Sequence, residues 1–272
     1  MTATGQGFGL YYDAALTKPT PYRDANDYVA KARDRMDRTF DLIAPFVKGA
    51  TVLDVGASPF YLLDRAKRAG AARCHGVYFA NDDHPLRHLN RIYSPAGPIE
   101  ISHADAENEG FPFADDAVDV LTACEILEHF DAFPVRFATE VRRVLRPGGH
   151  LCITVPNVAS IANIIKLVFQ RNIYMKYRSD VTGRHKHEYT LSQLKAFIAY
   201  LGMDVVKAGY MPSPTSDLYR LRPAYRALSA IPGVRSYSPV LYILARQPAV
   251  KPTSDLEVPP DALYDRSLSI EE

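Results

Sequence analysis

Residues 124–130, with the sequence CEILEHF, bring two carboxylates and one imidazole into five consecutive positions. Glu125 and Glu128 are three residues apart and would share one face of a helix, with His129 beside them. Groups of these types could act as general acid and base, could bind a metal ion, or could form only the polar start of a helix. The residue types leave all three interpretations open.

A second candidate site lies upstream, where the apolar run TVLDVG at residues 51–56 leads through small residues into the helical pattern of residues 61–70. Small side chains at the carboxyl end of a strand let a cofactor approach the backbone. The loop holds a single glycine and so lacks the G-x-G-x-x-G fingerprint of a dinucleotide-binding turn. The residues expected to contact a cofactor are Asp54, Gly56, Ala57 and Ser58.

Strand and helix patterns alternate along the chain and would bring these segments to one edge of a sheet. Strands are expected at residues 51–56, 73–80, 99–105, 148–157, 203–211 and 236–248, and residues 116–127 read as a strand that continues into a helix. Helical patterns cover residues 27–49, 61–70 and 190–202, the last with Thr190 as N-cap and Gln193 completing a capping box. Such alternation predicts an α/β fold with a mostly parallel sheet.

The composition narrows the class of protein. The chain has 272 residues, 47% of them hydrophobic, which suits one sizeable core with a small appended lobe. A net charge of only +1 argues against DNA as a partner. Because the sequence shows no leader pattern and no apolar run long enough to span a bilayer, we expect a cytoplasmic protein. The three cysteines are far apart in sequence and are expected to be free thiols.

Residues 102–130, SHADAENEGFPFADDAVDVLTACEILEHF, add further motifs in the same order. Together with VLDVG upstream and EVRRVLRPGGHLCITVPN downstream, they closely resemble the class I S-adenosylmethionine-dependent methyltransferases. The resemblance extends over residues 29–247. It implies a Rossmann-like α/β fold with a seven-stranded, mostly parallel sheet, whose antiparallel last strand lies near residues 237–245.

The resemblance implies S-adenosylmethionine as the cofactor. Its methionine half would lie near Asp54 and Glu125, and its adenine edge would be read by Asp105 and Ala106.

The end of the second strand departs from the family pattern. An acidic residue usually stands there and holds the ribose hydroxyls, but this chain has Tyr78. Asp82 or Asn81, from the loop that follows, is therefore expected to reach back to the ribose. The alternative is that this loop is only a solvated turn.

An acceptor hydroxyl in such an enzyme must lose its proton, and histidine accepts protons near neutral pH. The expected bases are His129 and His187, the latter in the later segment GRHKHEYT, with Glu128 as a further catalytic candidate. Structural roles stay open for both histidines: His129 could cap a helix, and His187 could be a surface residue.

The acceptor itself is suggested by two features. The GASPF loop at residues 56–60 resembles that of bacterial methyltransferases from polysaccharide and glycan pathways, which implies a sugar hydroxyl. Residues 166–187 are basic and interleaved with aromatic residues, and they follow an apolar segment at residues 158–169. This region could form a lid over a sugar or lipid-linked glycan, a patch that binds RNA, or a solvated helix face, and the apolar segment favours the lid.

The E-x-x-E-H pattern has a second resemblance. Followed by a distant His-rich segment, it is similar to that of small-RNA 3′-terminal ribose 2′-O-methyltransferases, but it also occurs in metal-free quinone-biosynthesis methyltransferases. We therefore predict no metal. The alternative is an RNA methyltransferase with a metal held by Glu125, Glu128, His129 and His187. Another alternative is a degenerate methyltransferase fold that acts as a binding protein.

The domain organisation follows from the extent of the motifs. We expect an N-terminal cap at residues 1–50, a methyltransferase domain at residues 51–247 with a lid inserted at about residues 157–187, and a flexible, acidic and Pro-rich tail at residues 248–272. The expected partners are a small-molecule or glycan acceptor and, at the periphery, a lipid-linked substrate. The sequence does not predict the oligomeric state.

Overall fold

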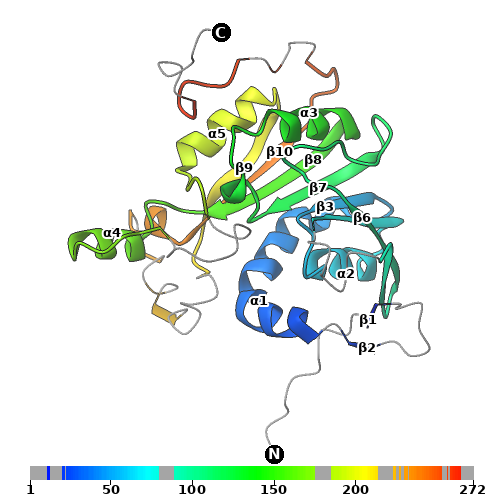
Figure 1. Cartoon of the computed structure of the whole chain (residues 1–272), viewed down its shortest axis with the longest axis horizontal. Coiled ribbons are helices and arrows are strands. Elements are labelled where there is room, and N and C mark those ends of the chain that lie inside the picture. The colour runs from blue at the N-terminus through cyan, green and yellow to red at the C-terminus, as the bar shows by residue number, and fades with distance from the viewer. Residues whose placement is uncertain are drawn as a thin grey trace, which may run out of the picture.

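One sheet organises the molecule, with its strands in the order β2-β1-β5-β6-β4-β3-β7-β8-β10-β9 (Figure 1). The computed structural model describes residues 11–12, 20–21, 23–79, 89–174, 185–213, 223–224, 227, 230–231, 233–252, 256 and 258–264. The strands are β1 Tyr11–Tyr12, β2 Thr20–Pro21, β3 Thr51–Val55, β4 Arg73–Tyr78, β5 Arg91–Ser94, β6 Gly97–His103, β7 Val118–Cys124, β8 Leu145–Pro156, β9 Asp204–Met211 and β10 Val240–Arg246. The helices are α1 Arg23–Ile43, α2 Tyr61–Arg68, α3 Val135–Val144, α4 Ile161–Val168 and α5 Leu191–Tyr200, with single 3₁₀ turns η1 Ala44–Phe46, η2 Leu127–His129 and η4 Arg235–Tyr237.

The five central strands are parallel, which confirms the predicted α/β class. Strand β3 pairs with β4 on one side and β7 on the other, and β6 and β8 continue the parallel arrangement outward. Parallel neighbours need a crossover connection, which α2 provides between β3 and β4 and α3 provides between β7 and β8. All five carboxyl ends therefore meet at one edge.

Both faces of the sheet are covered by helices (Figure 1). Successive strand residues point to opposite faces, so Val52 packs with α1 and α2 whereas Leu53 packs with α3 and α5. Strand β7 repeats the pattern with Val120 and Leu121. Strands buried on both faces read as continuous apolar runs, which explains why this part of the sheet could be predicted from sequence.

The two edges of the sheet differ in how well they were predicted. Strand β10 lies antiparallel between β8 and β9, as the resemblance implies. The prediction of seven strands is wrong, because three further strands, β5, β1 and β2, extend the sheet beyond β6. All three additions are short and antiparallel.

A hairpin accounts for this extra edge. Ser94 of β5 pairs with Gly97 of β6, so only two residues turn the chain. The backbone N–H of Ala96 donates to the Ser94 hydroxyl over 2.9 Å, and Gly97 has a φ of 125°. No strand was predicted at residues 91–94, because so short a segment offers only a weak apolar pattern.

The predicted helices form, with shifted ends. Helix α1 ends at Ile43, where Pro45 enters the η1 turn. Helix α5 begins with the predicted capping box, because the Thr190 hydroxyl accepts from the backbone N–H of Gln193 and the Gln193 side chain accepts from that of Thr190. Strand β8 begins at Leu145, earlier than the strand expected at residues 148–157, and so includes the Pro-Gly-Gly segment, beside a shift in its register with β7.

The described residues of the C-terminal tail lie against α3 and α5. Arg142 of α3 donates to the carbonyl of Pro252, and Tyr200 of α5 donates to that of Leu256. Gln193 donates to the carbonyl of Ala262 over 3.2 Å. This attachment was not expected from an acidic, Pro-rich sequence. Among the described residues, no helix is both long and apolar enough to cross a membrane.

Candidate active site

The loop after β3 brings its backbone to the carboxyl edge of the sheet. Gly56 has a φ of 74°, a left-handed conformation that favours glycine. The N–H groups of Gly56 and Ala57 both donate to the carbonyl of Val77 on β4, over 2.9 and 3.1 Å. A Cβ on Gly56 would lie only 2.1 Å from Cγ2 of Ile126, so this position is closed to any side chain in the structure. The packing of Ile126 and the left-handed backbone thus explain the glycine at this position, and the role of Gly56 in cofactor binding stays a prediction.

A small cavity of ≈ 30 Å³ opens beside this loop. It is lined from the loop side by Asp54, Gly56, Ala57 and Ser58 and from the α1 side by Tyr28 and Arg35. The four loop residues predicted from the sequence are thus brought together. The helix contributes a wall that was not predicted.

Asp54 is the buried acid of this cavity. Its carboxylate accepts a hydrogen bond from the Thr122 hydroxyl over 2.6 Å, and its side chain is almost wholly shielded from solvent. Burial raises the pKa of Asp54 to about 7, although the Thr122 hydrogen bond acts in the opposite direction. A neighbouring cation would favour the ionised form, so this carboxyl is suited to an ammonium group.

Arg35 is the buried cation of the cavity. It was not among the site residues predicted from the sequence. One of its terminal nitrogens donates to the Tyr28 hydroxyl over 2.8 Å, and the other lies 3.6 Å from a carboxylate oxygen of Glu125. Its Nε is buried and has no partner among the described residues. A sequence signal existed, because Arg35 falls in the buried stripe of the helix between Ala32 and Thr39.

A larger cavity of ≈ 320 Å³ shares Gly56 with the first. Its other lining residues include Val77, Phe79, Asp105, Ala106, Ile126, His129, Phe130 and Lys186. The predicted pair Asp105 and Ala106 is therefore placed at a cavity next to the loop. The Asp105 carboxylate also accepts from the Glu107 backbone N–H over 2.9 Å and from the Asn108 amide over 2.8 Å, which holds its orientation.

The end of β4 presents aromatic residues. Tyr78 lies between the rings of Phe60 and His103, at centroid distances of 6.0 and 6.3 Å. Phe79 follows and is 55% exposed while it lines the larger cavity, so it offers a flat apolar surface there. Phe79 was not predicted from the sequence. Asp82 and Asn81 lie outside the described residues, and the assignment of Asp82 to a ribose stays a prediction.

The CEILEHF segment does not begin an ordinary helix. Glu125 has a φ of 58°, and only the single turn η2 follows before the chain extends again at Phe130. Glu125 is held in this conformation by Thr154, whose carbonyl accepts its N–H over 2.8 Å and whose hydroxyl donates to its carboxylate over 3.0 Å. The prediction that Glu125 and Glu128 share a helix face is therefore wrong. Glu125 points to Arg35 instead.

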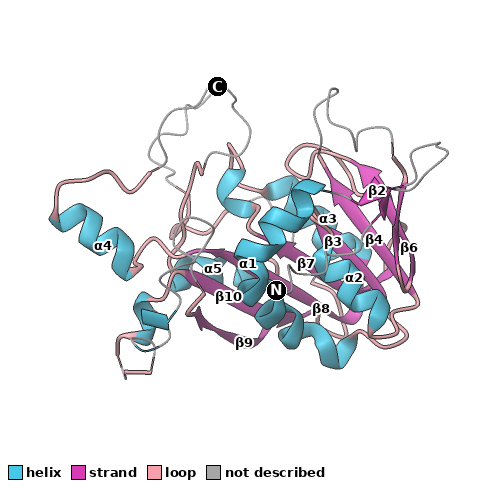
Figure 2. Cartoon of the chain, turned by 90° about the horizontal axis from the view of Figure 1, so that it is seen from below, coloured by secondary structure: helices cyan, strands magenta, loops and turns pink. Residues whose placement is uncertain are grey.

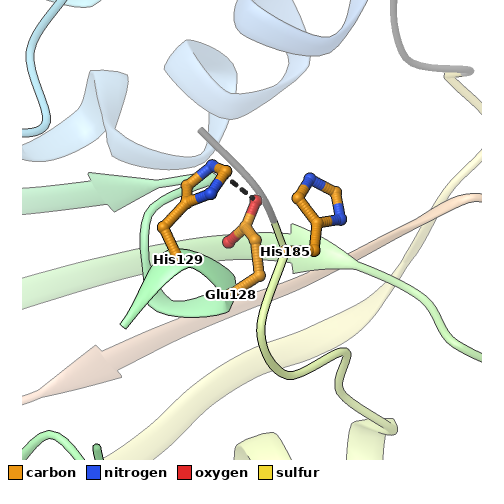
Figure 3. A group of neighbouring side chains, drawn as sticks. All are labelled: Glu128, His129 and His185. Carbon is orange, nitrogen blue, oxygen red and sulfur yellow. Dashed lines mark ion pairs between the residues drawn. The ribbon is translucent and has the colours of Figure 1, made fainter. Parts of the chain in front are cut away.

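Glu128, His129 and His185 form a polar cluster next to the larger cavity (Figure 3). Glu128 has no exposed surface, and a carboxylate oxygen lies 3.9 Å from Nε2 of His129. The rings of His129 and His185 lie 5.1 Å apart between centroids. Burial, reinforced by the charge of Glu125, raises the pKa of Glu128 well above its usual range.

His187, the other predicted base, lies apart from this cluster. Its ring packs against Tyr189 at 4.7 Å between centroids and does not line either cavity. Burial lowers the pKa of His187, although Glu188 acts in the opposite direction. Its backbone N–H and that of Lys186 both donate to the Glu128 carbonyl, over 3.3 and 2.6 Å. These bonds hold the 185–187 segment against η2 and bring His185 into the cluster.

Comparisons with known proteins place the middle of the chain next to methyltransferases. Residues 53–153 match a family described as "Methyltransferase domain". An uncharacterized methyltransferase of Mycolicibacterium vanbaalenii is 34% identical over 101 residues, which is 37% of each chain. A ubiquinone biosynthesis O-methyltransferase of Ruegeria sp. is 27% identical over 192 residues, which is 69% of this chain and 74% of that protein. The first of these relatives is therefore matched over well under half of its length.

A solved structure extends the likeness to the fold. The S-adenosylmethionine-dependent methyltransferase of Mesorhizobium loti superposes with a TM-score of 0.54 at 16% identity, covering 77% of this chain and 96% of the other. Residues 53–153 therefore match a methyltransferase domain, and the chain has the fold of the S-adenosylmethionine-dependent methyltransferase from Mesorhizobium loti.

Proposed function

We propose that the protein transfers a methyl group from S-adenosylmethionine to an acceptor hydroxyl, and that the acceptor is a sugar of a polysaccharide, a glycolipid or a glycosylated metabolite. The observation that carries this proposal is the order of groups along the carboxyl edge. The small cavity, lined by Asp54 and Arg35, and the larger cavity, lined by His129, lie next to each other at this edge. Gly56 lines both of them.

The residues of the smaller cavity fit the methionine half of the cofactor. Asp54 would hold its ammonium group, and the unpartnered Nε of Arg35 would meet its carboxylate. In the larger cavity, Asp105 would accept from the adenine amino group, with the exposed ring of Phe79 against the base. S-adenosylmethionine supplies a methyl carbon that its sulfonium has already activated, so the protein mainly has to position the nucleophile and exclude water.

The acceptor hydroxyl must also lose its proton, and we assign this task to the cluster of Glu128, His129 and His185. His129 is the member that lines the larger cavity. Its imidazole can contact a hydroxyl held there, while the buried Glu128 carboxyl lies behind it. His187, which lies outside the cavity, is not needed for this role.

An amphiphilic acceptor is favoured by helix α4, which projects away from the sheet (Figure 2). The helix and the residue after it expose apolar side chains, with Val168 at 72% and Phe169 at 70% exposure. A patch of this kind suits the lipid part of a lipid-linked sugar at the periphery of the molecule. The name of the relative from Ruegeria, a ubiquinone biosynthesis O-methyltransferase, supports transfer to oxygen.

Calorimetry with S-adenosylmethionine and its demethylated product is the first test. We expect binding of one cofactor per chain. Absence of binding would overturn the proposal and favour a degenerate fold that acts as a binding protein.

The acceptor is tested by transfer of labelled methyl groups to a panel of lipid-linked sugars, free sugars and short RNAs. We expect label in the sugar hydroxyls. Label confined to RNA termini would contradict the sugar assignment and favour ribose methylation.

A further inference from the structure

Glu128 is buried although no hydrogen bond to its carboxyl group is found among the described residues. Its side chain has no exposed surface, and neither carboxylate oxygen has a hydrogen-bond partner among the described residues. A buried carboxyl whose two oxygens lack hydrogen-bond partners is unfavourable in a folded protein, whether it is ionised or protonated. Groups of this kind usually have a partner that the protein atoms alone do not supply.

Arg35 and Lys186, two described cations near the cluster, have other partners. Arg35 pairs with Glu125 and donates to Tyr28. Lys186 pairs with Asp131 at the surface. In the described part of the chain, neither of them forms an ion pair or a hydrogen bond with the Glu128 carboxyl.

The neighbours of Glu128 that remain are imidazoles. One ligand atom from each of Glu128, His129 and His185 lies within 4.8 Å of the other two, and Figure 3 shows the Glu128 carboxylate between the two imidazole rings. We propose that these three residues bind a divalent metal ion at the acceptor side of the cleft.

A contact with Glu188 orients the His185 imidazole for this role. Its Nδ1 lies 3.2 Å from a carboxylate oxygen of Glu188, whose other oxygen accepts from the Asn163 amide over 3.1 Å. A carboxylate that holds one imidazole nitrogen as N–H leaves the other nitrogen free to bind a metal, and such supporting contacts are typical of histidine ligands. Asn163 is buried and also donates to the carbonyl of Val158, so α4 helps to support the site.

This ligand set differs from the one that the E-x-x-E-H pattern suggests, and it revises the prediction of no metal. Glu125 is not one of the three residues whose ligand atoms lie together, and Arg35 and Thr154 both contact its Oε1. His185 takes the place of His187, whose ring packs on Tyr189.

The chemistry of the donors points to a class of ion. One carboxylate and two imidazoles favour a first-row transition ion, from manganese to zinc, over magnesium or calcium, which prefer oxygen ligands. Three protein ligands leave coordination positions open, and the larger cavity lies next to them because His129 lines it.

The consequence for catalysis rests on the proposed function. A hydroxyl bound to a divalent cation loses its proton more readily than a free one, so the ion would activate the acceptor oxygen. His129 would then act as a ligand of the metal and not as a free base. Binding of the ion itself does not depend on the identity of the acceptor.

Cobalt provides the test because its bound form has visible absorption bands. The full-length protein is stripped with a chelator and titrated with cobalt chloride, and we expect one ion per chain. The variants H185A and E128Q should each bind cobalt at least tenfold more weakly. The matched control is H187A, which removes an imidazole from the same segment but outside the cluster and should bind cobalt as the wild type does.

Cofactor calorimetry on each variant shows that it is folded and separates this inference from the proposed function. H185A should bind S-adenosylmethionine within about twofold of the wild type. No cobalt binding by the wild type, or equal binding by the wild type, H185A and E128Q, would overturn the metal site. Cobalt binding without methyl transfer would support the metal site and contradict the proposed function. Methyl transfer without cobalt binding would support the proposed function and contradict the metal site.

Discussion

Arg35 in helix α1 lies 3.6 Å from Glu125 at the end of β7, nitrogen to oxygen, and both side chains are nearly buried. This pair joins a segment near the N-terminus to the middle of the chain at the cofactor edge of the sheet. Because Arg35 also donates to Tyr28, the wall of the smaller cavity depends on one guanidinium.

Replacement of Arg35 should weaken cofactor binding. A charge-assisted hydrogen bond contributes about 1.5–3 kcal/mol, so R35M should raise the Kd for S-adenosylmethionine roughly 10- to 100-fold in calorimetry. R35K keeps the positive charge near Glu125 but loses the planar set of donors, so its Kd should lie between those of the wild type and R35M. The matched control is R38M, three residues further along the same helix, where Arg38 pairs with Asp34 among the described residues. An equal loss of affinity in R38M would show that the effect comes from the helix and not from Arg35.

Cofactor affinity should depend on pH through Asp54. Burial raises the pKa of this carboxyl to about 7, so below that pH it is protonated and must release a proton when an ammonium group binds beside it. Affinity should therefore rise about tenfold from pH 5.5 to pH 7 and then level off. Calorimetry in two buffers measures both the affinity and the proton release. In D54N the rise should disappear, and a slope unchanged in that variant would assign the titration to another group.

The same raised pKa has the opposite sign for the stability of the cofactor-free protein. The folded state holds the Asp54 proton more tightly than the unfolded chain, so this group's contribution to stability falls as pH rises from about 4 to about 7. Thermal unfolding measures this effect. The melting temperature of the wild type minus that of D54N should decrease as pH rises across this range.

Two glycines with the same φ allow the cost of a left-handed backbone to be measured apart from the cost of a steric clash. Gly49 and Gly56 both have a φ of 74°, but a Cβ on Gly49 meets nothing within 4 Å whereas one on Gly56 meets Ile126. G49A should lower the free energy of unfolding by about 1 kcal/mol from the left-handed conformation alone. G56A should lower it by about 1–3 kcal/mol more and should weaken cofactor binding. Equal losses in chemical denaturation would show that Ile126 moves aside freely.

His129 should be essential for turnover but not for cofactor binding. H129A removes the cluster member that lines the acceptor cavity, so we expect kcat to fall by about two orders of magnitude or more. The Kd for S-adenosylmethionine should stay within about twofold. H187A, the other base predicted from the sequence, should lower kcat by less than tenfold because His187 lines neither cavity. A larger loss in H187A than in H129A would reverse this assignment.

The apolar surface at the end of α4 should affect only acceptors that carry a lipid. The double variant V168S and F169S replaces the two most exposed apolar side chains of this surface. We expect KM for a lipid-linked sugar to rise several-fold while KM for the corresponding water-soluble sugar is unchanged. An equal rise for both acceptors would indicate that α4 contacts the sugar itself.

Much of the framework could be predicted from the sequence because its signals are local. The doubly buried run at Val52 and Leu53, the glycine after β3 and the capping box of Thr190 each depend on residues within a few positions of one another. The order of motifs then predicted which strand ends meet, and the structure brings Asp54 and Asp105 to the same edge as expected.

The composition of the site was decided by contacts between distant segments. Arg35 reaches Glu125, so the CEILEHF segment cannot offer both carboxylates to one partner, and Thr154 holds Glu125 in a left-handed conformation that helical spacing does not predict. His185 joins Glu128 while His187 does not, because the backbone bonds to the Glu128 carbonyl set how that segment lies. Residue types and spacing determined which chemistry was available. Only packing across the sheet edge decided which of those groups meet, because a side chain's partner depends on elements that are remote in sequence.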